Sequence, residues 1–196
     1  MKFFAAVFAF VAFVALPAQA ADASHVQVKT SKGVFVFELN AEAAPKTVAN
    51  FLQYVEDGHY QRSIFHRVVK GFVVQGGGYS QYFNERPTRD PVPYEGDNGL
   101  SNVRGTIAMA RTRNPNSATA QWYVNLKDNT NLDHLENDIG VRPGYTVFGK
   151  VVDGLEVIDA IGAVETGEGG PFPAEVPQET ILIESVEVVD WPQTDQ

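Results

Sequence analysis

The chain has 196 residues, enough for one domain of ordinary size with a substantial hydrophobic core. Its 24 acidic and 15 basic residues give a formal net charge of −9, which argues against a protein that grips nucleic acid through a basic surface. The chain has no cysteine, so disulfide scaffolds, cysteine-rich zinc sites and thiol nucleophiles are excluded. We therefore expect a globular protein with no nucleic acid partner.

The N-terminus has the features of a secretory signal peptide. Lys2 precedes an unbroken apolar run over residues 3–16, and the segment ends in Ala18-Gln19-Ala20. The run is too short for a membrane-spanning helix, which needs about 20 apolar residues. A buried N-terminal helix is the alternative interpretation, but no polar residue in the run marks a solvent face. We expect cleavage after Ala20, export to the periplasm or, alternatively, secretion, no stable membrane anchor afterwards, and one mature domain over residues 21–196.

Eight short apolar or alternating stretches, separated by turn-forming residues, predict a mainly β protein. Many short strands of this kind are typical of a sandwich or a closed barrel. No glycine- or serine-rich linker and no internal repeat divides the chain. The expected strands cover residues 25–30, 34–39, 64–69, 72–75, 106–110, 121–126, 146–152 and 181–189.

Two helices are expected, each with one apolar face that could close an open end of a barrel. The first begins at Pro45, a residue tolerated at the first helical position, and ends at Gly58. The second covers residues 153–161 and starts with Asp-Gly-Leu-Glu, which we interpret as a capping box. Residues 78–104 and 162–180 are expected loops. The first of these is too long for a plain connection, so we expect it to be a functional surface loop.

The sequence matches several known functional-site patterns only poorly. The four histidines form no pair at metal-ligand spacing, so no metal is expected. Gly76-Gly77-Gly78 lacks the ending of a phosphate loop and is interpreted as a tight turn. Asn129-x-Asn131-x-Asp133 resembles the start of a calcium loop, but His134 stands where glycine is needed, so we interpret it as a solvated turn. A solvated loop face is also the interpretation for Glu165, Glu168, Glu175 and Glu179.

Residues 65–77, Phe-His-Arg-Val-Val-Lys-Gly-Phe-Val-Val-Gln-Gly-Gly, place one arginine and one glutamine among apolar side chains. Strand alternation predicts that Arg67 shares a face with Phe65 and Val69, opposite the residues between them. Taken alone, Arg67 is better explained as an ordinary exposed strand arginine, and Phe72 and Val73 as core residues.

Residues 65–77, together with four further segments in the same order along the chain, resemble the cyclophilin family of peptidyl-prolyl cis-trans isomerases. The likeness covers about residues 25–190. With Leu-Ser-Asn-Val-Arg at residues 100–104, it is closest to the bacterial, periplasmic type. The resemblance implies a closed eight-stranded antiparallel β-barrel capped by two α-helices, in agreement with the elements counted above. Besides residues 65–77, the matching segments are 44–51, 105–111, 117–125 and 147–154.

The resemblance also implies which residues form the site. Arg67 matches the catalytic arginine, and Gln75 matches the glutamine that orients this arginine and the substrate. The residues that match the proline pocket of the family are Phe72, Val73, Tyr123 and Leu132. Those that match the groove for the residues before proline are Ala110, Arg111 and Gln121. Tyr145 stands where many family members have a histidine.

Five positions depart from the family pattern. Val73 replaces the usual methionine, which makes the pocket floor shorter and stiffer. Tyr123 replaces phenylalanine and adds a hydroxyl, while Trp122 replaces the phenylalanine before it. Arg111 replaces an asparagine whose backbone the family uses. Asn131 stands where eukaryotic members have tryptophan, which implies weak cyclosporin binding. We expect these changes to alter substrate preference rather than the reaction.

The resemblance implies a reaction that needs no nucleophile, metal or cofactor. An X–Pro bond rotates over a barrier of roughly 18–20 kcal/mol because resonance gives it partial double-bond character. A donor such as Arg67 can hydrogen-bond the prolyl nitrogen, whose lone pair is freed only in the twisted state. We therefore predict a monomeric isomerase that acts on proline-containing polypeptides during the folding of exported proteins.

Two other functions are open at this point. The same groove could bind proline peptides as a chaperone module without turnover. A carbohydrate-binding barrel would instead use Trp122, Tyr79 and Tyr82, although no paired carboxylates mark a site for it.

Overall fold

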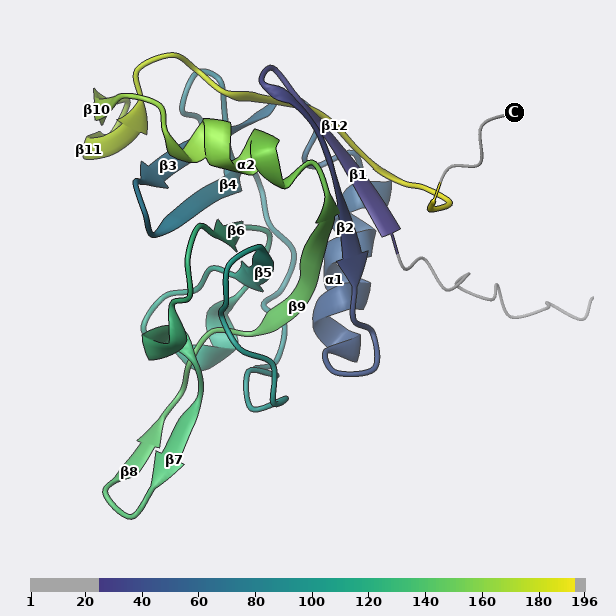
Figure 1. The fold of residues 1–196 in the computed structure, drawn as a ribbon, viewed down its shortest axis with the longest axis vertical. Coiled ribbons are helices and arrows are strands. Elements are labelled where there is room, and N and C mark those ends of the chain that lie inside the picture. Colours follow the sequence, from purple (N-terminus) through teal and green to yellow (C-terminus); the bar gives the residue numbers. More distant parts are fainter. Residues whose placement is uncertain (1–24, 193–196) are drawn as a thin grey trace, which may run out of the picture.

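The eight strands expected from the sequence form a closed barrel in the computed structural model, which describes residues 25–192 (Figure 1). These strands are β1 (His25–Thr30), β2 (Gly33–Leu39), β3 (Ser63–Val69), β4 (Val73–Ser80), β5 (Thr106–Met109), β6 (Trp122–Asn125), β9 (Val147–Asp153) and β12 (Leu182–Val188). Their order around the barrel is β1-β12-β3-β4-β6-β5-β9-β2, and β2 pairs with β1 to close the ring. All of these pairings are antiparallel, which confirms the predicted fold class.

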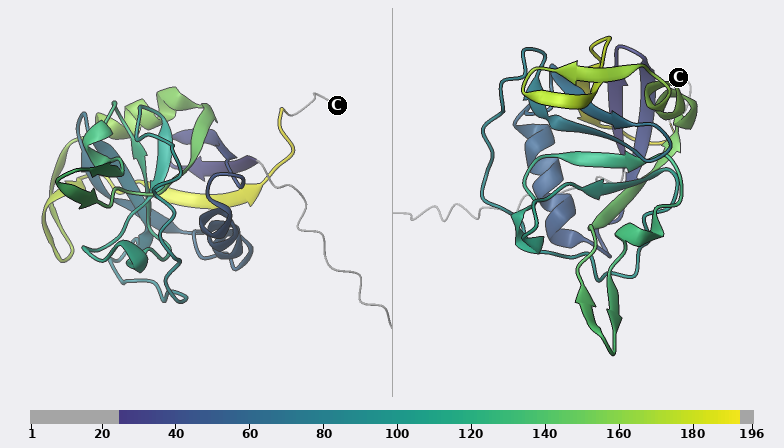
Figure 2. Two further views of the ribbon diagram at one scale, coloured as in Figure 1. Left: turned by 90° about the horizontal axis from the view of Figure 1, so that it is seen from below. Right: turned by 90° about the vertical axis from the view of Figure 1, so that its left-hand side faces the viewer.

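Helices α1 (Pro45–Glu56) and α2 (Leu155–Gly162) lie on opposite sides of the barrel (Figures 1 and 2). Phe51 of α1 and Ile158 of α2 are fully buried in the same core cluster as the inward side chains of the strands. The two helices therefore complete one hydrophobic core. Within residues 25–192, neither helix is long and apolar enough to cross a membrane. The predicted signal peptide lies outside the described residues.

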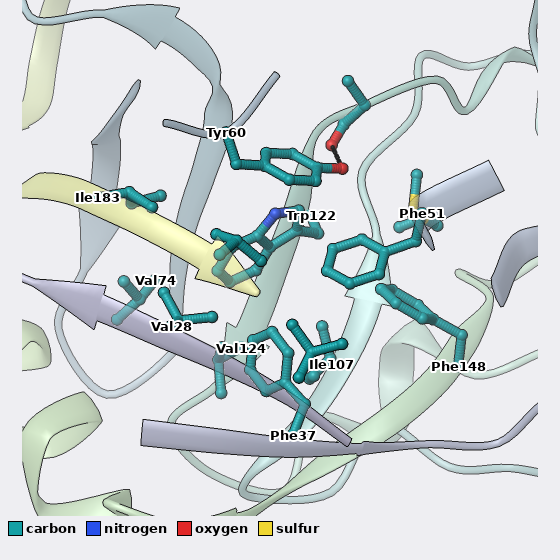
Figure 3. Packing of buried hydrophobic residues seen from close by; sticks show 14 of the residues in the cluster. Val28, Phe37, Phe51, Tyr60, Val74, Ile107, Trp122, Val124, Phe148 and Ile183 are labelled. Carbon is teal, nitrogen blue, oxygen red and sulfur yellow. Dashed lines mark hydrogen bonds between the residues drawn. The ribbon is translucent and has the colours of Figure 1, made fainter. Parts of the chain in front are cut away.

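The core is centred on Trp122, which is fully buried in the barrel (Figure 3). The rings of Phe37 and Phe65 stand edge-on to its indole, with centroids 5.3 and 5.5 Å away. The rings of Phe51 and Tyr60 complete the cluster at 6.4 and 6.3 Å. Edge-to-face pairs of this kind add to the free energy gained from burial. Since Trp122 is inaccessible, the carbohydrate-binding alternative, which required it on the surface, is wrong.

Two hairpins were not expected from the sequence. β7 (Leu135–Asn137) pairs with β8 (Gly140–Arg142), and β10 (Thr166–Gly169) pairs with β11 (Phe172–Pro177). The prediction of a plain loop over residues 162–180 is therefore wrong in part. These strands are short, pair only with each other, and have no clear apolar alternation, so the sequence signal for them is weak.

The three glycines at residues 76–78 continue β4 and do not form the predicted tight turn. Large aromatic rings press against this part of the strand. At Gly77, which has φ +85°, a Cβ would lie 2.9 Å from the ring of Tyr60 and 3.1 Å from the indole nitrogen of Trp122. Glycine is needed here because the backbone passes close to the core rings.

The long segment that follows β4 packs on the barrel and supports α1. Val92 is buried and forms an isolated bridge with Ala118. The carboxylate of Glu95 accepts hydrogen bonds from the backbone N–H groups of Lys46 and Thr47, at 3.1 and 2.8 Å. Glu95 thus caps the first turn of α1, whose N-terminal residue Ala44 has no capping side chain. This contact gives the segment a structural role, while the predicted functional role stays a prediction.

The start of α2 differs from the predicted capping box. The N-cap residue is Gly154 in the left-handed conformation, with φ +74° and no side-chain capping bond. A Cβ at this position would lie 2.4 Å from the carbonyl oxygen of Val34. Glycine lets β9 turn into α2 directly against β2, so close approach and positive φ decide this helix start.

We expect Gly154→Ala to lower the free energy of unfolding by about 2 kcal/mol or more, because it combines an unfavourable φ with overpacking. Gly99→Ala is the matched control, since Gly99 also has positive φ but no atom within 4 Å of the place that an added Cβ would take. Gly99→Ala should lower the free energy of unfolding by about 1 kcal/mol. Urea unfolding measures both, and equal costs would contradict the role of the contact with β2.

Candidate active site

Three of the predicted site residues lie in one row across the outer face of the barrel wall. Arg67 on β3 is opposite Gln75 on β4, and Gln75 is opposite Tyr123 on β6. The row continues from Tyr123 to Ala108 on β5 and to Val147 on β9. Side chains alternate between the two faces of a strand, so neighbouring residues on β4 and β6, such as Val74 and Trp122, face the core. The site and the core therefore use opposite faces of the same strands.

A cavity of about 320 Å³ lies over this row. Val73 and Tyr123 form its floor, and both belong to a small apolar cluster on the outer wall that also contains Ala108 and Val147. A cavity of this size, largely apolar with a few polar groups, is typical of a site for a small ligand group. Nine of the ten predicted site residues line it: Arg67, Phe72, Val73, Gln75, Ala110, Arg111, Tyr123, Leu132 and Tyr145.

The tenth residue, Gln121, lines an adjoining cavity of about 320 Å³ that shares Arg67 and Gln75 with the first. The side-chain oxygen of Gln121 accepts a hydrogen bond of 3.0 Å from Nε2 of Gln75. The side chain of Gln121 lies so close to Gly78 that a Cβ added to Gly78 would be 2.5 Å from it. The structure thus places Gln121 behind Gln75, as its support. Its predicted contact with residues before proline stays a prediction.

Arg67 is held on two sides at the edge of the cavity. Its Nη1 donates a 3.3 Å hydrogen bond to Oε1 of Gln75, and its Nε donates a 2.6 Å hydrogen bond to Oε2 of Glu175 on β11. The interpretation of Glu175 as part of a loop is wrong, because it lies on a strand and pairs with Arg67, although its side chain is still 43% exposed. The two partners are 108 positions apart in the chain, and only the fold brings them together.

The expected alternation along β3 is interrupted. Phe65 pairs with Gly76 and Arg67 pairs with Gln75, so two steps on β3 match one step on β4. This is a β-bulge, which shifts the facing of the residues after it. Phe65 and Val68 both enter the core, whereas Arg67 faces outward. The prediction that Arg67 shares a face with Phe65 is wrong for this reason.

Buried amide side chains support the cavity floor from below. The hydroxyl of Tyr123 donates to Oδ1 of Asn102 at 2.8 Å, so it points away from the cavity, and burial raises the pKa of this hydroxyl. Nδ2 of Asn129 donates to the carbonyl of Phe72 at 2.9 Å and to Oδ1 of Asn125 at 2.8 Å. Asn129 is buried, so the interpretation of its segment as a solvated turn is wrong at this residue.

Arg111 and Tyr145 form the opposite rim of the cavity. The guanidinium of Arg111 lies over the ring of Tyr145, 4.4 Å from its centroid, and donates hydrogen bonds to the carbonyls of Pro143 and Gly144. The ring of Tyr145 in turn stands edge-on to that of Tyr123 at 5.8 Å. The side chain of Arg111 thus builds the rim, while the predicted contact of its backbone with the substrate stays a prediction.

A larger cavity of about 640 Å³ lies along β2 and β9. It shares Leu100 and Val147 with the apolar cluster under the site. The charged strand residues on its wall, Glu38 and Lys150, pair with each other at 2.9 Å. It contains none of the predicted site residues, and we assign the site to the smaller cavity.

His66, next to Arg67, is buried and faces away from the core, against two partly buried rings. The rings of Tyr79 and Phe172 lie 4.7 and 5.6 Å from its imidazole. Burial, with a smaller contribution from the charge of Arg67, lowers the pKa of His66 to about 4. As the pH falls below about 6.5, His66 is therefore protonated in the unfolded chain before it is protonated in the folded protein.

The contribution of His66 to the free energy of unfolding should therefore be complete above pH 6.5. It should decrease by about 3 kcal/mol as the pH falls toward 4. Urea unfolding at several pH values measures the slope. His66→Asn should flatten it in part, with His59, whose pKa burial also lowers, giving the remainder. An unchanged slope in the variant would contradict this assignment.

Taken together, the fold and the site define a class: an antiparallel barrel whose outer wall holds an apolar pocket beside a fixed arginine. The chain matches the family described as cyclophilin type peptidyl-prolyl cis-trans isomerase/CLD over residues 25–188. The chain belongs to this family. It is therefore a peptidyl-prolyl cis-trans isomerase, a class of enzyme that acts on proline-containing peptides.

Bacterial members are similar over most of the chain. Peptidyl-prolyl cis-trans isomerase A of Dickeya dadantii is 48% identical over 174 residues, which cover 88% of this chain and 89% of the relative. Peptidyl-prolyl cis-trans isomerase B of Escherichia coli is 45% identical over 163 residues, covering 83% and 98%. A Cryptosporidium parvum cyclophilin type isomerase, solved in the presence of the dipeptide Ala-Pro, aligns with a TM-score of 0.64 at 27% identity, covering 85% of this chain and 99% of that one.

Proposed function

We propose that the enzyme accelerates X–Pro rotation through Arg67, with the proline ring seated on the apolar floor. The observation that carries this proposal is the position of Arg67, fixed by Gln75 at the edge of a cavity of about 320 Å³. The Cryptosporidium parvum relative solved in the presence of the dipeptide Ala-Pro supports a proline-containing peptide as the ligand of this pocket.

The geometry fits a noncovalent mechanism. The floor around Val73 and Tyr123 holds the ring by burial, while the group before proline turns about the C–N bond. Twisting removes the resonance, so the prolyl nitrogen regains a lone pair that Arg67 can bind. A donor that binds the twisted state better than the planar state lowers the barrier. A 10⁵-fold acceleration needs roughly 7 kcal/mol, of which a charged donor in a partly dry pocket can supply a large part.

We also propose that the enzyme is exported and acts, as a monomer, on exported proteins while they fold. Support comes from residues 1–20, whose basic start, apolar run and Ala-x-Ala ending are those of a signal peptide. Expression of the full chain followed by cell fractionation tests this step. Recovery in the periplasmic fraction with an N-terminus at Ala21 is expected, and retention of the uncleaved chain in the cytoplasm would contradict it. Sedimentation of the purified protein tests the monomer.

The folding role is tested on a protein whose refolding is limited by a trans-to-cis proline step. Catalytic amounts of the enzyme should speed this slow phase, which otherwise takes tens to hundreds of seconds. The alternative, a chaperone module without turnover, predicts saturable peptide binding and an unchanged slow phase. Turnover at substoichiometric enzyme separates the two.

A further inference from the structure

We infer that Glu175 is a positioning residue for Arg67, which deepens the proposed function and rests on it. Its carboxylate lies on β11, outside the barrel, and accepts the Nε–H of Arg67 at 2.6 Å. A short bond between an ionised donor and an ionised acceptor is the stronger kind of hydrogen bond. The other contact of the guanidinium, to the neutral amide of Gln75, is longer at 3.3 Å.

The two contacts leave other donors of the guanidinium free. A guanidinium has five N–H donors in a rigid plane, and fixing two of its three nitrogens fixes the third. Glu175 occupies Nε and Gln75 occupies one hydrogen of Nη1. Within residues 25–192, Nη2 of Arg67 has no hydrogen-bond partner, although Arg67 lines the cavity. Glu175 and Gln75 thus hold the plane while Nη2 stays available.

Glu175 is itself held in place by the hairpin. Phe172, three residues earlier on β11, packs its ring against His66 and Tyr79 and so anchors the hairpin beside β3 and β4. Val176, which follows Glu175, is buried. Between these anchors, Glu175 has φ +67°, a left-handed conformation that residues with a Cβ rarely adopt. Unfavourable backbone conformations of this kind persist where surrounding structure imposes them, often beside functional groups.

The ion pair matters because arginine is a long and flexible side chain. An unpaired Arg67 would have to lose its rotamer freedom when the substrate reaches the twisted state. A partner that fixes the guanidinium beforehand removes this cost from the transition state, which is the advantage of a preorganised donor. Both side chains remain part-exposed, so the pair contributes little to stability, and its consequence is expected in turnover.

The test measures kcat and KM separately on a chromogenic Ala-Pro tetrapeptide. Glu175→Ala should lower kcat by about 5- to 20-fold and change KM less than about twofold, because the donor is lost from its position rather than from the site. Glu175→Gln keeps an acceptor for Nε and should recover part of the loss. Glu168→Ala, which removes an exposed carboxylate from the neighbouring strand β10, is the matched control and should retain the rate of the parent enzyme.

A double-mutant cycle separates positioning from a structural role. In an Arg67→Ala background, Glu175→Ala should have no further effect, since it acts through an absent group. An equal loss in both backgrounds would overturn the inference and indicate damage to the hairpin. An unchanged kcat for Glu175→Ala, with Arg67→Ala inactive, would overturn it while leaving the proposed function intact. Full activity of Arg67→Ala would instead reject the proposed function itself.

Discussion

Arg67→Ala is expected to reduce kcat/KM by about 10²- to 10³-fold, the effect of removing one preorganised donor, equivalent to about 3–4 kcal/mol of transition-state stabilisation. The loss should fall mainly on kcat. The apolar floor, on which we propose that the proline ring sits, should stay in place, because Val73 and Tyr123 belong to one apolar cluster with Ala108 and Val147. Peptide isomerisation measured with varied substrate concentration separates kcat from KM.

Arg104→Ala is the matched control for this experiment. Arg104 is an exposed arginine that pairs with Asp159 at 2.6 Å and does not line the cavity. Its removal takes away the same charge and should leave kcat/KM within about twofold. Retained binding of a proline peptide by Arg67→Ala, with turnover lost, is the expected pattern. Comparable rates for Arg67→Ala and the parent enzyme would refute the mechanism.

Trp122→Ala is expected to lower the free energy of unfolding by about 3–5 kcal/mol, since it removes the ring at the centre of the aromatic core. Trp122→Phe should cost clearly less. It keeps most of the ring contacts and removes an indole nitrogen that is buried without a hydrogen-bond partner. Unfolding in urea, followed by circular dichroism, measures both variants.

An exposed aromatic residue provides the control for the core variants. The side chain of Tyr82 is 76% exposed, and Tyr82→Ala should change stability by less than about 0.5 kcal/mol. If Trp122→Ala cost no more than Tyr82→Ala, the ring would not organise the core, and the barrel would have to be stable without it.

The barrel could be predicted because its strands are stretches of apolar residues bounded by turn signals. The hairpin of β1 and β2, the start of α1 at Pro45 and the closing strand β12 all follow from local pattern. Local pattern fails where distant parts of the chain decide the conformation. The glycines at residues 76–78 resemble a turn, yet they continue a strand because rings from elsewhere press against them.

The site could be predicted as a set of residues but not as a geometry. Motif resemblance identified the residues that line the cavity, from Arg67 to Tyr145. It did not identify Glu175 or Asn129, which act through contacts with Arg67 and with the backbone of Phe72. Both lie in polar segments where a carboxylate or an amide usually faces water. Predicting Glu175 and Asn129 would have required knowing which segments pack against the outer wall of the barrel.

The row from Arg67 to Val147 has a consequence for how the protein tolerates sequence change. Its central strands, β4 and β6, carry the pocket on one side and the core on the other, at alternate positions. Replacing an outward residue alters ligand preference without touching the core, so the pocket is open to divergence by substitution. Deleting a single residue from β4 or β6 exchanges the two sides at once and places Gln75 or Tyr123 where Val74 or Trp122 belongs. We therefore expect insertions and deletions to be tolerated in the connections, such as those that contain the β7–β8 and β10–β11 hairpins.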